Sequence, residues 1–575
     1  MNSLFLALIG LILFGLGYRF YASYISTKIY SLQDFTGEVP AKEFQDGIDF
    51  VPTKKGILFG HHFTSIAGAA PIIGPCIAAF WGWLPALLWI VLGTIFMGAV
   101  HDFGALVVSV REKGKTIADI TGTIINKRVK TMFLIFVMML SWLVLAVFAM
   151  AIAGLFVSIP TAVLPVNIEI IIALAVGFLL YRKKVDALIP SIIALILLYV
   201  FVYIGSFTPL SFEAIGMDKA SQYTLWIILL FIYSGIASLL PIWLLLQPRD
   251  YINSHQLIVG LVLIFIGIAI AQPVVEAPMI RSAGEEVPGL FPLLFVTIAC
   301  GAISGFHGLV ASGTTSKQVS NIQDTKMIGY GSMLGEGTLA LASTIAAVAG
   351  ISLVTNCNLP SIGAVDNLSW NIYYDTWAHA ATNKATAFVL GGGALIQSLG
   401  IPQTLAKTIM AVLVISFAAT TLDTATRIQR FILIEVGQTI NVPLLKNRYI
   451  ATFVAIVPAL ALTLWNIADP VSGELTQAGW VLWPIFGASN QMLAALTLMT
   501  LSIYFWKKNK PVLPLIIPFI FITVTTLSSL AVNAQSFIGN NPLLFVIDCI
   551  LATLILWMLY EGWTVFRAGR SQEIF

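Results

Sequence analysis

Residues 60–75, GHHFTSIAGAAPIIGP, form the stretch that decides the fold, because it is apolar enough to lie in a membrane but too rich in breakers to form one helix. Gly68, Pro71, Gly74 and Pro75 all follow Thr64. Each proline removes a backbone donor and clashes with the preceding turn, so carbonyl groups are left without helical partners at membrane depth. The stretch therefore predicts a broken membrane helix whose open carbonyls can face a cation or a polar solute.

A second stretch of the same character is GAISGFHGLVASGTTS at residues 301–316, which holds four glycines and ends in a row of hydroxyls. Laying Gly60 on Gly305 also aligns His62 with His307. The spans predicted below place the two stretches an odd number of crossings apart, so they run antiparallel, as an inverted repeat requires. A chance match is the alternative, because glycine is common wherever membrane helices pack closely.

The composition assigns the whole chain to the membrane. Of its 575 residues, 58% are hydrophobic and only 10% are charged, which excludes a water-soluble fold. Backbone groups in lipid must bond to one another, so each long apolar run is a helix of about 20 residues. The sequence therefore predicts an all-α polytopic membrane protein with about 15 transmembrane helices. The predicted spans are 3–25, 60–82, 84–110, 131–156, 164–181, 187–207, 223–246, 255–275, 290–316, 329–354, 404–426, 449–468, 480–503, 512–531 and 543–566.

The distribution of basic residues predicts the orientation. The alternate loops that begin with 26–59 hold most of the Lys and Arg residues, and the opposite loops hold only Lys219, Arg281, Lys384 and Lys407. Because cytoplasmic loops carry the basic excess, the N-terminus is expected outside and the C-terminus in the cytoplasm. Residues 355–403 are then an outer loop, whose short apolar part is expected to be a re-entrant or surface helix. Residues 504–575 are expected to form two extra C-terminal helices.

Several function classes are disfavoured by the sequence. It holds no phosphate-cradling loop, nucleophile elbow or metalloprotease spacing, so neither catalysis nor a cofactor is expected. Its net charge of +3 is spread over short loops, which argues against a nucleic-acid partner. We expect the lipid bilayer as its surroundings and an ion gradient as its energy source.

Ionisable residues at membrane depth are costly and usually mark pathways, proton relays or ion sites. For His62 and His307 the alternative is a neutral core histidine, but their place in both broken stretches favours a functional role. His61, His101 and Asp102 are predicted near cytoplasmic helix ends, where a cap or a local ion pair explains them equally well.

Glu336 lies in the small-residue run GSMLGEG at 331–337, with no basic residue within one turn. It must be protonated, paired to another helix or bound to a cation. We expect it to be the proton-carrying carboxylate. The alternative is a permanently neutral acid that only donates a hydrogen bond.

Thr420, Asp423, Thr424 and Arg427 share one face of a predicted helix. Hydroxyls beside a carboxylate resemble a hard-cation site, so Thr420, Asp423 and Thr424 are sodium candidates. An ion pair between Asp423 and Arg427, four residues apart, is an equally good interpretation.

The motifs Gly60-His-His-Phe-x-Ser-Ile-Ala-Gly-Ala, Gly305-Phe-His-x-Leu-x-Ala-Ser-Gly-Thr-Thr-Ser-Lys-Gln and Gly335-Glu-Gly337 resemble the carbon starvation protein A (CstA) family over nearly the whole chain. The resemblance implies a bacterial inner-membrane transporter used under carbon starvation, either for peptides or for pyruvate with protons. It also implies a five-plus-five inverted-repeat core of the LeuT-like, APC superfamily type with extra helices. The spans near 60–82 and 290–316 would then each begin a repeat, and 404–426 would face the first across a cation site.

The first hypothesis is a secondary symporter that imports a small carboxylate, pyruvate by resemblance, by alternating access with a proton or sodium. Half-helix N-termini suit an anionic carboxylate. A peptide transporter of the same family is the nearest alternative. A membrane nutrient sensor or channel is a third, although neither readily explains two antiparallel broken helices.

The candidate site residues follow from this hypothesis. Substrate contacts are expected from His62, Thr64, Ser65, Gly68, Ser304, His307, Gly308 and Ser312. Ion coupling is expected at Glu336, Asp423, Thr420, Thr424, Thr314, Thr315, His61, His101 and Asp102.

Overall fold

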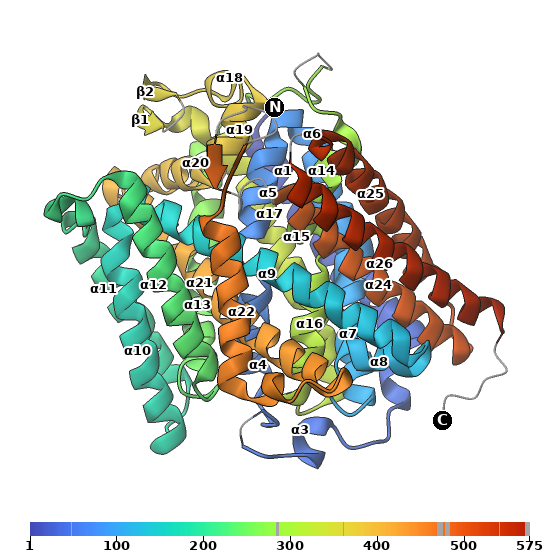
Figure 1. The fold of residues 1–575 in the computed structure, drawn as a ribbon. Helices are drawn as coiled ribbons and strands as arrows, with labels where there is room; N and C mark the ends of the chain where they lie inside the picture. Colours follow the sequence, from blue (N-terminus) through green and yellow to red (C-terminus); the bar gives the residue numbers. More distant parts are fainter. Residues whose placement is uncertain are drawn as a thin grey trace.

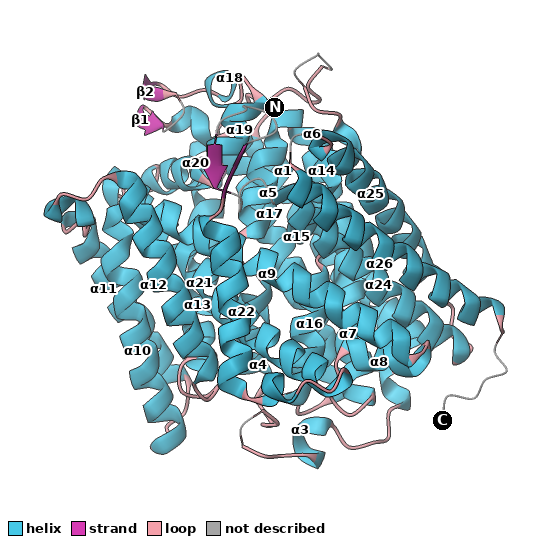
Figure 2. Ribbon diagram, viewed as in Figure 1, coloured by secondary structure: helices cyan, strands magenta, loops and turns pink. Residues whose placement is uncertain are grey.

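A computed structural model describes residues 1–47, 49–282, 287–359, 362–383, 385–468, 475–477, 483–539 and 541–569. Nearly every element in these residues is a helix (Figure 2), which confirms the all-α class. The described strands form two short antiparallel hairpins. One pairs β1 (Asn356–Leu359) with β2 (Gly363–Asp366), and the other pairs β3 (Asn466–Ala468) with β4 (Leu475–Gln477).

The α-helices are α1 (Ser3–Leu16), α2 (Ala22–Tyr24), α3 (Pro40–Glu43), α4 (Lys55–Ile66), α5 (Ala70–Ala78), α6 (Trp83–Gly93), α7 (Ala99–Arg111), α8 (Ile117–Ile124), α9 (Lys127–Ser158), α10 (Val163–Arg182), α11 (Leu188–Phe207), α12 (Lys219–Leu239), α13 (Leu246–Ala271), α14 (Leu290–Thr297), α15 (Ala299–Ala302), α16 (Gly305–Gly313), α17 (Ser332–Val348), α18 (Trp370–Tyr373), α19 (Trp377–Asn383), α20 (Thr386–Gln397), α21 (Gln403–Thr439), α22 (Arg448–Leu464), α24 (Trp483–Lys507), α25 (Leu513–Phe537) and α26 (Pro542–Arg567). Short π-helical turns extend α1 to Ile29, join α6 to α7 and lead into α17.

Among the described residues, ten helices are long and apolar enough to cross a membrane, or eleven if the bent pair α4 and α5 forms one span. The other predicted ranges also hold helices, namely α14 to α16, α17, α22 and α24. The chain is therefore a multi-pass membrane protein. The total of fifteen crossings stays a prediction.

Helices α9 and α21 form the interior of the bundle. In the most apolar window of each helix, 89% of the residues are buried for α21 and 78% for α9, against 33% for α11 and 28% for α26. Figure 1 shows α10, α11 and α12 along one side of the molecule and α25 with α26 along the other. The outer helices therefore turn most of their apolar surface outward, where lipid is the expected neighbour.

The first predicted break is present, between α4 and α5. The two helices are bent by 47°, and Ala67 leaves the helical region with φ −76° and ψ 66°. Pro71, one of the predicted breakers, lies in the first turn of α5, a few residues after the break. A proline is tolerated there, since the first N–H groups of a helix have no helical partner in any case.

The second predicted break is also present, but it lies at Ile303 and Ser304, whose backbones are extended between α15 and α16. Gly308, one of the four glycines of the stretch, lies inside α16. It serves close packing, since a Cβ on Gly308 would lie 3.1 Å from His101 Cε1.

The two broken helices make matching contacts. α4 packs on α13, and α16 packs on α24. A Cβ on Gly60 would lie 2.7 Å from Ser254 Oγ of α13, and a Cβ on Gly305 would lie 2.4 Å from Leu493 Cβ of α24. The two glycines that the sequence aligns therefore occupy the same kind of close helix contact.

The junction of α12 and α13 differs from the prediction. α12 ends at Leu239 because Leu240 precedes a proline and is extended. α13 already begins at Leu246, so the predicted loop 247–254 is helical, with its proline in the first turn. As a result, Arg249 and Asp250 are buried inside the bundle and do not lie in a cytoplasmic loop.

The range 355–403 contains the β1–β2 hairpin and α18 to α20. α20 is buried and packs on α17 and α21. Its 12 residues span about 18 Å, too short to cross the bilayer. Lys384 lies outside the described residues. α25 and α26 occupy the C-terminal range where two extra helices are predicted.

Candidate functional site

Four titratable side chains meet beside the second break. His307 Nδ1 lies 2.9 Å from Asp102 Oδ2, and His101 Nδ1 lies 2.7 Å from Asp102 Oδ1. On its other side, His307 Nε2 lies 3.2 Å from Glu336 Oε2. The members come from α7, α16 and α17, and none is more than 1% exposed. We call Glu336, His307, Asp102 and His101, in this order, the histidine–carboxylate chain.

This chain can hold and pass protons, because each neighbour is within reach of the next and each can change charge. Glu336 is paired to another helix, which is one of the three outcomes that the sequence allowed. His101 and Asp102 do form the local pair that the sequence allowed, but the expectation of a hydrated helix end is wrong, since both are fully buried.

A second polar cluster lies between α10, α12, α13 and α21. Arg249 Nη1 lies 2.5 Å from Asp423 Oδ2, and Arg249 Nε donates to Glu169 Oε1 at 3.2 Å. The Tyr233 hydroxyl donates to Asp423 Oδ2 at 2.8 Å. Ser416 Oγ donates to the other Glu169 oxygen at 2.5 Å. We call Glu169, Tyr233, Arg249 and Asp423 the arginine cluster.

The residue after Arg249 holds the last turn of α4. Asp250 Oδ2 lies 2.6 Å from His61 Nδ1 and accepts a hydrogen bond from Ser65 Oγ at 3.1 Å. Thr64 Oγ1 donates to the Asp250 carbonyl at 3.0 Å. His61 is 3% exposed, so it does not lie at the hydrated helix end where the sequence analysis predicted it. Three of the predicted site residues therefore fix α4 to α13 just before the first break.

The remaining predicted residues divide into two groups. Some bridge segments that are distant in sequence: His62 Nδ1 lies 2.9 Å from Thr315 Oγ1, and Asn253 donates to Thr420 Oγ1 at 3.0 Å. Gly68 approaches α21, since a Cβ there would lie 2.7 Å from Thr421 Oγ1.

Other predicted residues bond locally or to unpredicted partners. Thr314 Oγ1 donates to a carbonyl of its own helix, and Ser312 accepts from the Ile117 N–H at 3.1 Å. The Ser304 hydroxyl makes hydrogen bonds with both polar atoms of the Asn490 side-chain amide. Thr424 Oγ1 is buried without a hydrogen-bond partner among the described residues.

The local ion pair between Asp423 and Arg427 is not formed. Arg427 donates to the carbonyls of Ala237 and Leu240 at the end of α12. The cation beside Asp423 is Arg249, a residue the sequence analysis had counted in a loop. Pairing across helices thus replaces the pairing expected within one helix.

Sequence reasoning missed Glu169, Arg249, Asp250 and Asn490. Glu169 stands alone among apolar residues in a predicted span, a signal that could have identified it. Asn490 Oδ1 accepts from the Phe306 N–H at 2.9 Å, which satisfies a backbone donor freed by the second break. A neutral amide gives no charge signal, so only the structure reveals this role.

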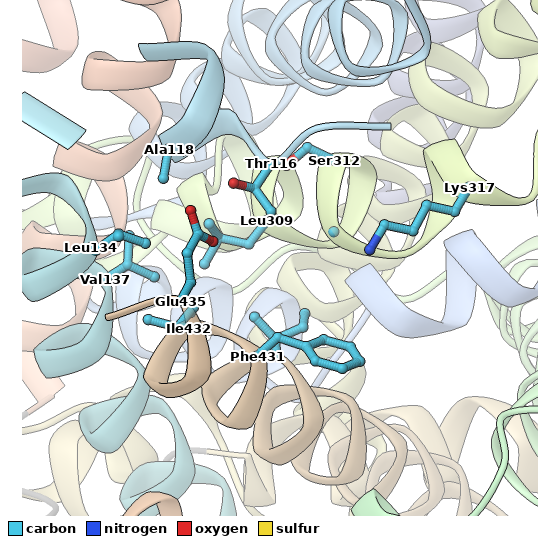
Figure 3. Close-up of a pocket in the computed structure, with 12 residues that line it drawn as sticks. Thr116, Ala118, Leu134, Val137, Leu309, Ser312, Lys317, Phe431, Ile432 and Glu435 are labelled. Carbon is cyan, nitrogen blue, oxygen red and sulfur yellow. The ribbon is translucent and has the colours of Figure 1, made fainter. Parts of the chain in front are cut away.

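A small cavity of about 50 Å³ lies between α8, α9, α16 and α21. Figure 3 shows Glu435 of α21 and Lys317 on opposite sides of it. Lys130 pairs with Glu435 at 3.0 Å and with Asp119. Burial lowers the pKa of Lys317, whose ammonium lies over the rings of Phe50 and Phe431.

Among the described residues, no group of three or more His, Cys, Asp or Glu side chains is placed to hold a metal ion. The arginine cluster already contains a positive charge beside its carboxylates. A bound cation there would have to displace or repel a guanidinium.

A family model described as carbon starvation protein CstA matches residues 2–529. The peptide transporter CstA of Campylobacter jejuni is 31% identical over 569 residues, covering 92% of this chain and 79% of the relative. The pyruvate/proton symporter BtsT of Escherichia coli is 30% identical over 618 residues, covering 94% of this chain and 82% of the relative.

Among solved structures, a manganese transporter of Eremococcus coleocola in complex with an aromatic bis-isothiourea compound is similar to this chain. It is 13% identical with a TM-score of 0.47, and the match covers 91% of this chain and 99% of the other. The family match is far more specific and includes both broken helices, the histidine–carboxylate chain and the arginine cluster. On that match, this multi-pass membrane protein belongs to the carbon starvation protein CstA family of transporters.

Proposed function

We propose that this chain imports a small carboxylate, with pyruvate as the first candidate, together with protons and by alternating access around its two helix breaks. The observation that carries the proposal is the histidine–carboxylate chain. In it, Glu336 lies 3.2 Å from His307, and His307 belongs to α16, the helix that follows the second break. Buried titratable groups in contact with a broken helix are where a transporter can link a proton to a change of shape.

Protons are favoured over sodium by the charge beside Asp423. Thr420, Asp423 and Thr424 were the sodium candidates, but Arg249 lies 2.5 Å from the Asp423 carboxylate. The guanidinium is always charged, so it supplies the positive charge that a sodium ion would bring. The histidine–carboxylate chain has no Lys or Arg among its members and is the better place for a transported proton.

Alternating access is supported by the matching contacts of the two broken helices. Gly60 brings α4 close to α13, as Gly305 brings α16 close to α24. The segment just before α4 and the segment that follows α16 also lie together, since the Thr53 N–H donates to the Gln318 carbonyl at 3.0 Å. These contacts favour the five-plus-five inverted repeat, in which both broken helices line one pathway.

Peptide import is the second candidate, because several relatives carry that name. The peptide transporters of Campylobacter jejuni and Helicobacter pylori are each 31% identical to this chain. A dipeptide shares its terminal carboxylate with pyruvate and adds an amine. Both substrates therefore fit a carboxylate transporter, and only transport measurements separate them.

The experiment is uptake of labelled pyruvate and labelled alanylalanine into proteoliposomes that contain the full chain. A pH gradient, acid outside, is imposed in one set and a sodium gradient in the other. The proposal expects accumulation of pyruvate with the pH gradient alone. Accumulation of alanylalanine only would select the peptide alternative, and accumulation with sodium only would overturn proton coupling.

A further inference from the structure

We propose that Arg249 is the group that binds the carboxylate of the transported substrate, and that Asp423 occupies this place when no substrate is bound. The inference rests on the proposed function, since it assumes that a carboxylate passes the helix breaks. It assigns a recognition role to a residue that the sequence analysis placed in a loop. The two carboxylates, one from the protein and one from the substrate, would alternate on the same guanidinium.

Arg249 has unused hydrogen-bonding capacity. The side chain is 1% exposed. Its Nε bonds to Glu169 and its Nη1 to Asp423 and Tyr233, while Nη2 has no hydrogen-bond partner among the described residues. A guanidinium binds a carboxylate best through two parallel N–H groups, so the contact with Asp423 through Nη1 alone is incomplete.

Asp423 and two threonines of the same helix, α21, also have unused hydrogen-bonding atoms. Asp423 Oδ1, Thr421 Oγ1 and Thr424 Oγ1 are also buried without a hydrogen-bond partner in the described part of the chain. A network with a purely structural role would normally satisfy its buried polar groups, because each unsatisfied one costs about 1–3 kcal/mol. Arg249 and Asp423 lie in contact, and each keeps an unused buried atom, Nη2 and Oδ1, which is suited to a polar ligand.

The arginine cluster lies next to the first helix break. Arg249 is the neighbour of Asp250, which holds the last turn of α4 through Ser65. Asp423 lies two residues from Thr421, whose hydroxyl contacts the break at Gly68. The guanidinium therefore lies between α13 and α21 at the height of the first break.

The charges agree with symport. The arginine cluster has one positive group and two carboxylates, Glu169 and Asp423, so a further carboxylate alone would add a second surplus negative charge. One proton that enters with the substrate leaves the net charge of the site unchanged. Binding of a substrate carboxylate at Arg249 therefore favours coupling to a proton, whichever acidic group carries it.

The test compares two substitutions that break the same ion pair. Pyruvate binding to the purified full chain is titrated by isothermal calorimetry for the wild type, Arg249→Met and Asp423→Asn. The proposal expects Arg249→Met to weaken pyruvate binding by about 10- to 100-fold, the value of a charged hydrogen bond. It expects Asp423→Asn to bind pyruvate as tightly as the wild type or several-fold tighter, because the competing carboxylate is gone.

A merely structural ion pair would make both variants lose binding together, and that result overturns the proposal. Equal binding by Arg249→Met and the wild type overturns it as well. If Arg249→Met does not fold, Asp423→Asn decides alone, because loss of binding there contradicts the exchange. Asp548→Asn is the matched control, since Asp548 is a carboxylate of α26 that is 1% exposed and belongs to neither cluster.

Neutral analogues complete the test. Methyl pyruvate, and alanylalanine with an amidated C-terminus, lack the carboxylate and are expected to bind poorly to the wild type and equally poorly to Arg249→Met. Equal affinity of the wild type for pyruvate and its methyl ester would overturn the inference. The proposed function fails separately, if the wild type accumulates neither pyruvate nor alanylalanine in a pH gradient.

Discussion

His307 and Asp102 lie 2.9 Å apart, and this contact joins the second broken helix to α7 at a depth where neither side chain reaches solvent. Asp102 also accepts from His101. One carboxylate therefore serves two imidazoles, and the positions of α7 and α16 depend on it. The contact stabilises the fold and at the same time connects groups that can exchange a proton.

Removal of the Asp102 carboxylate should destabilise the protein strongly. Asp102→Ala leaves two buried imidazoles without their acceptor, and loss of one partner of a buried pair costs about 3–5 kcal/mol. The measurement is thermal unfolding of the purified chain, followed by tryptophan fluorescence. Asp186→Ala is the control, because Asp186 pairs with Lys54 at 2.9 Å on the surface and such pairs add little. Equal shifts for the two variants would show that Asp102 is no more important than a surface acid.

The aligned glycines should differ in their tolerance of a methyl group. In Gly305→Ala the new Cβ would lie 2.5 Å from the Asn490 carbonyl, which cannot move aside, so a loss of about 1–3 kcal/mol is expected. In Gly60→Ala the nearest atom is the Ser254 hydroxyl, which can rotate, so the loss should be smaller.

Gly313→Ala is the control for this pair, because nothing lies within 4 Å of its Cβ position. Alanine favours a helix over glycine by about 1 kcal/mol, so this variant should be neutral or slightly more stable. Thermal unfolding measures all three variants. A Gly305→Ala protein as stable as Gly313→Ala would disprove the close contact of α16 with α24.

Removal of sodium should leave transport unchanged. Arg249 already provides the positive charge beside Asp423, so replacement of sodium by choline should not alter pyruvate uptake driven by a pH gradient. The measurement is the initial rate of uptake over a range of sodium concentrations. A rate that rises and saturates with sodium would point to a cation site at Thr420, Asp423 and Thr424.

The breaks in the membrane helices could be predicted from the sequence, because proline and clustered glycine act locally. Their exact places could not, since Pro71 is accommodated in a first helical turn and Gly308 inside a tightly packed helix. Both positions depend on neighbouring helices. Sequence patterns therefore identified the right segments, and the packing of the helices decides at which residue each one breaks.

The partners of the buried charges could not be predicted, because they come from distant parts of the chain. The run QPRDYINSH at 247–255 is polar enough to resemble a loop, yet it forms the first turns of α13. Asp423 has an arginine at helical spacing, Arg427, but bonds instead to Arg249. Spacing along one helix shows which residues share a face, and only the packing of helices decides what that face meets.

The most direct test of the account is proton coupling through Glu336. Glu336→Gln keeps the shape of the side chain but cannot carry a proton, so it should abolish pyruvate accumulation driven by a pH gradient while counterflow of labelled pyruvate continues. Asp548→Asn should leave both activities intact. Accumulation by Glu336→Gln equal to that of the wild type would contradict the account.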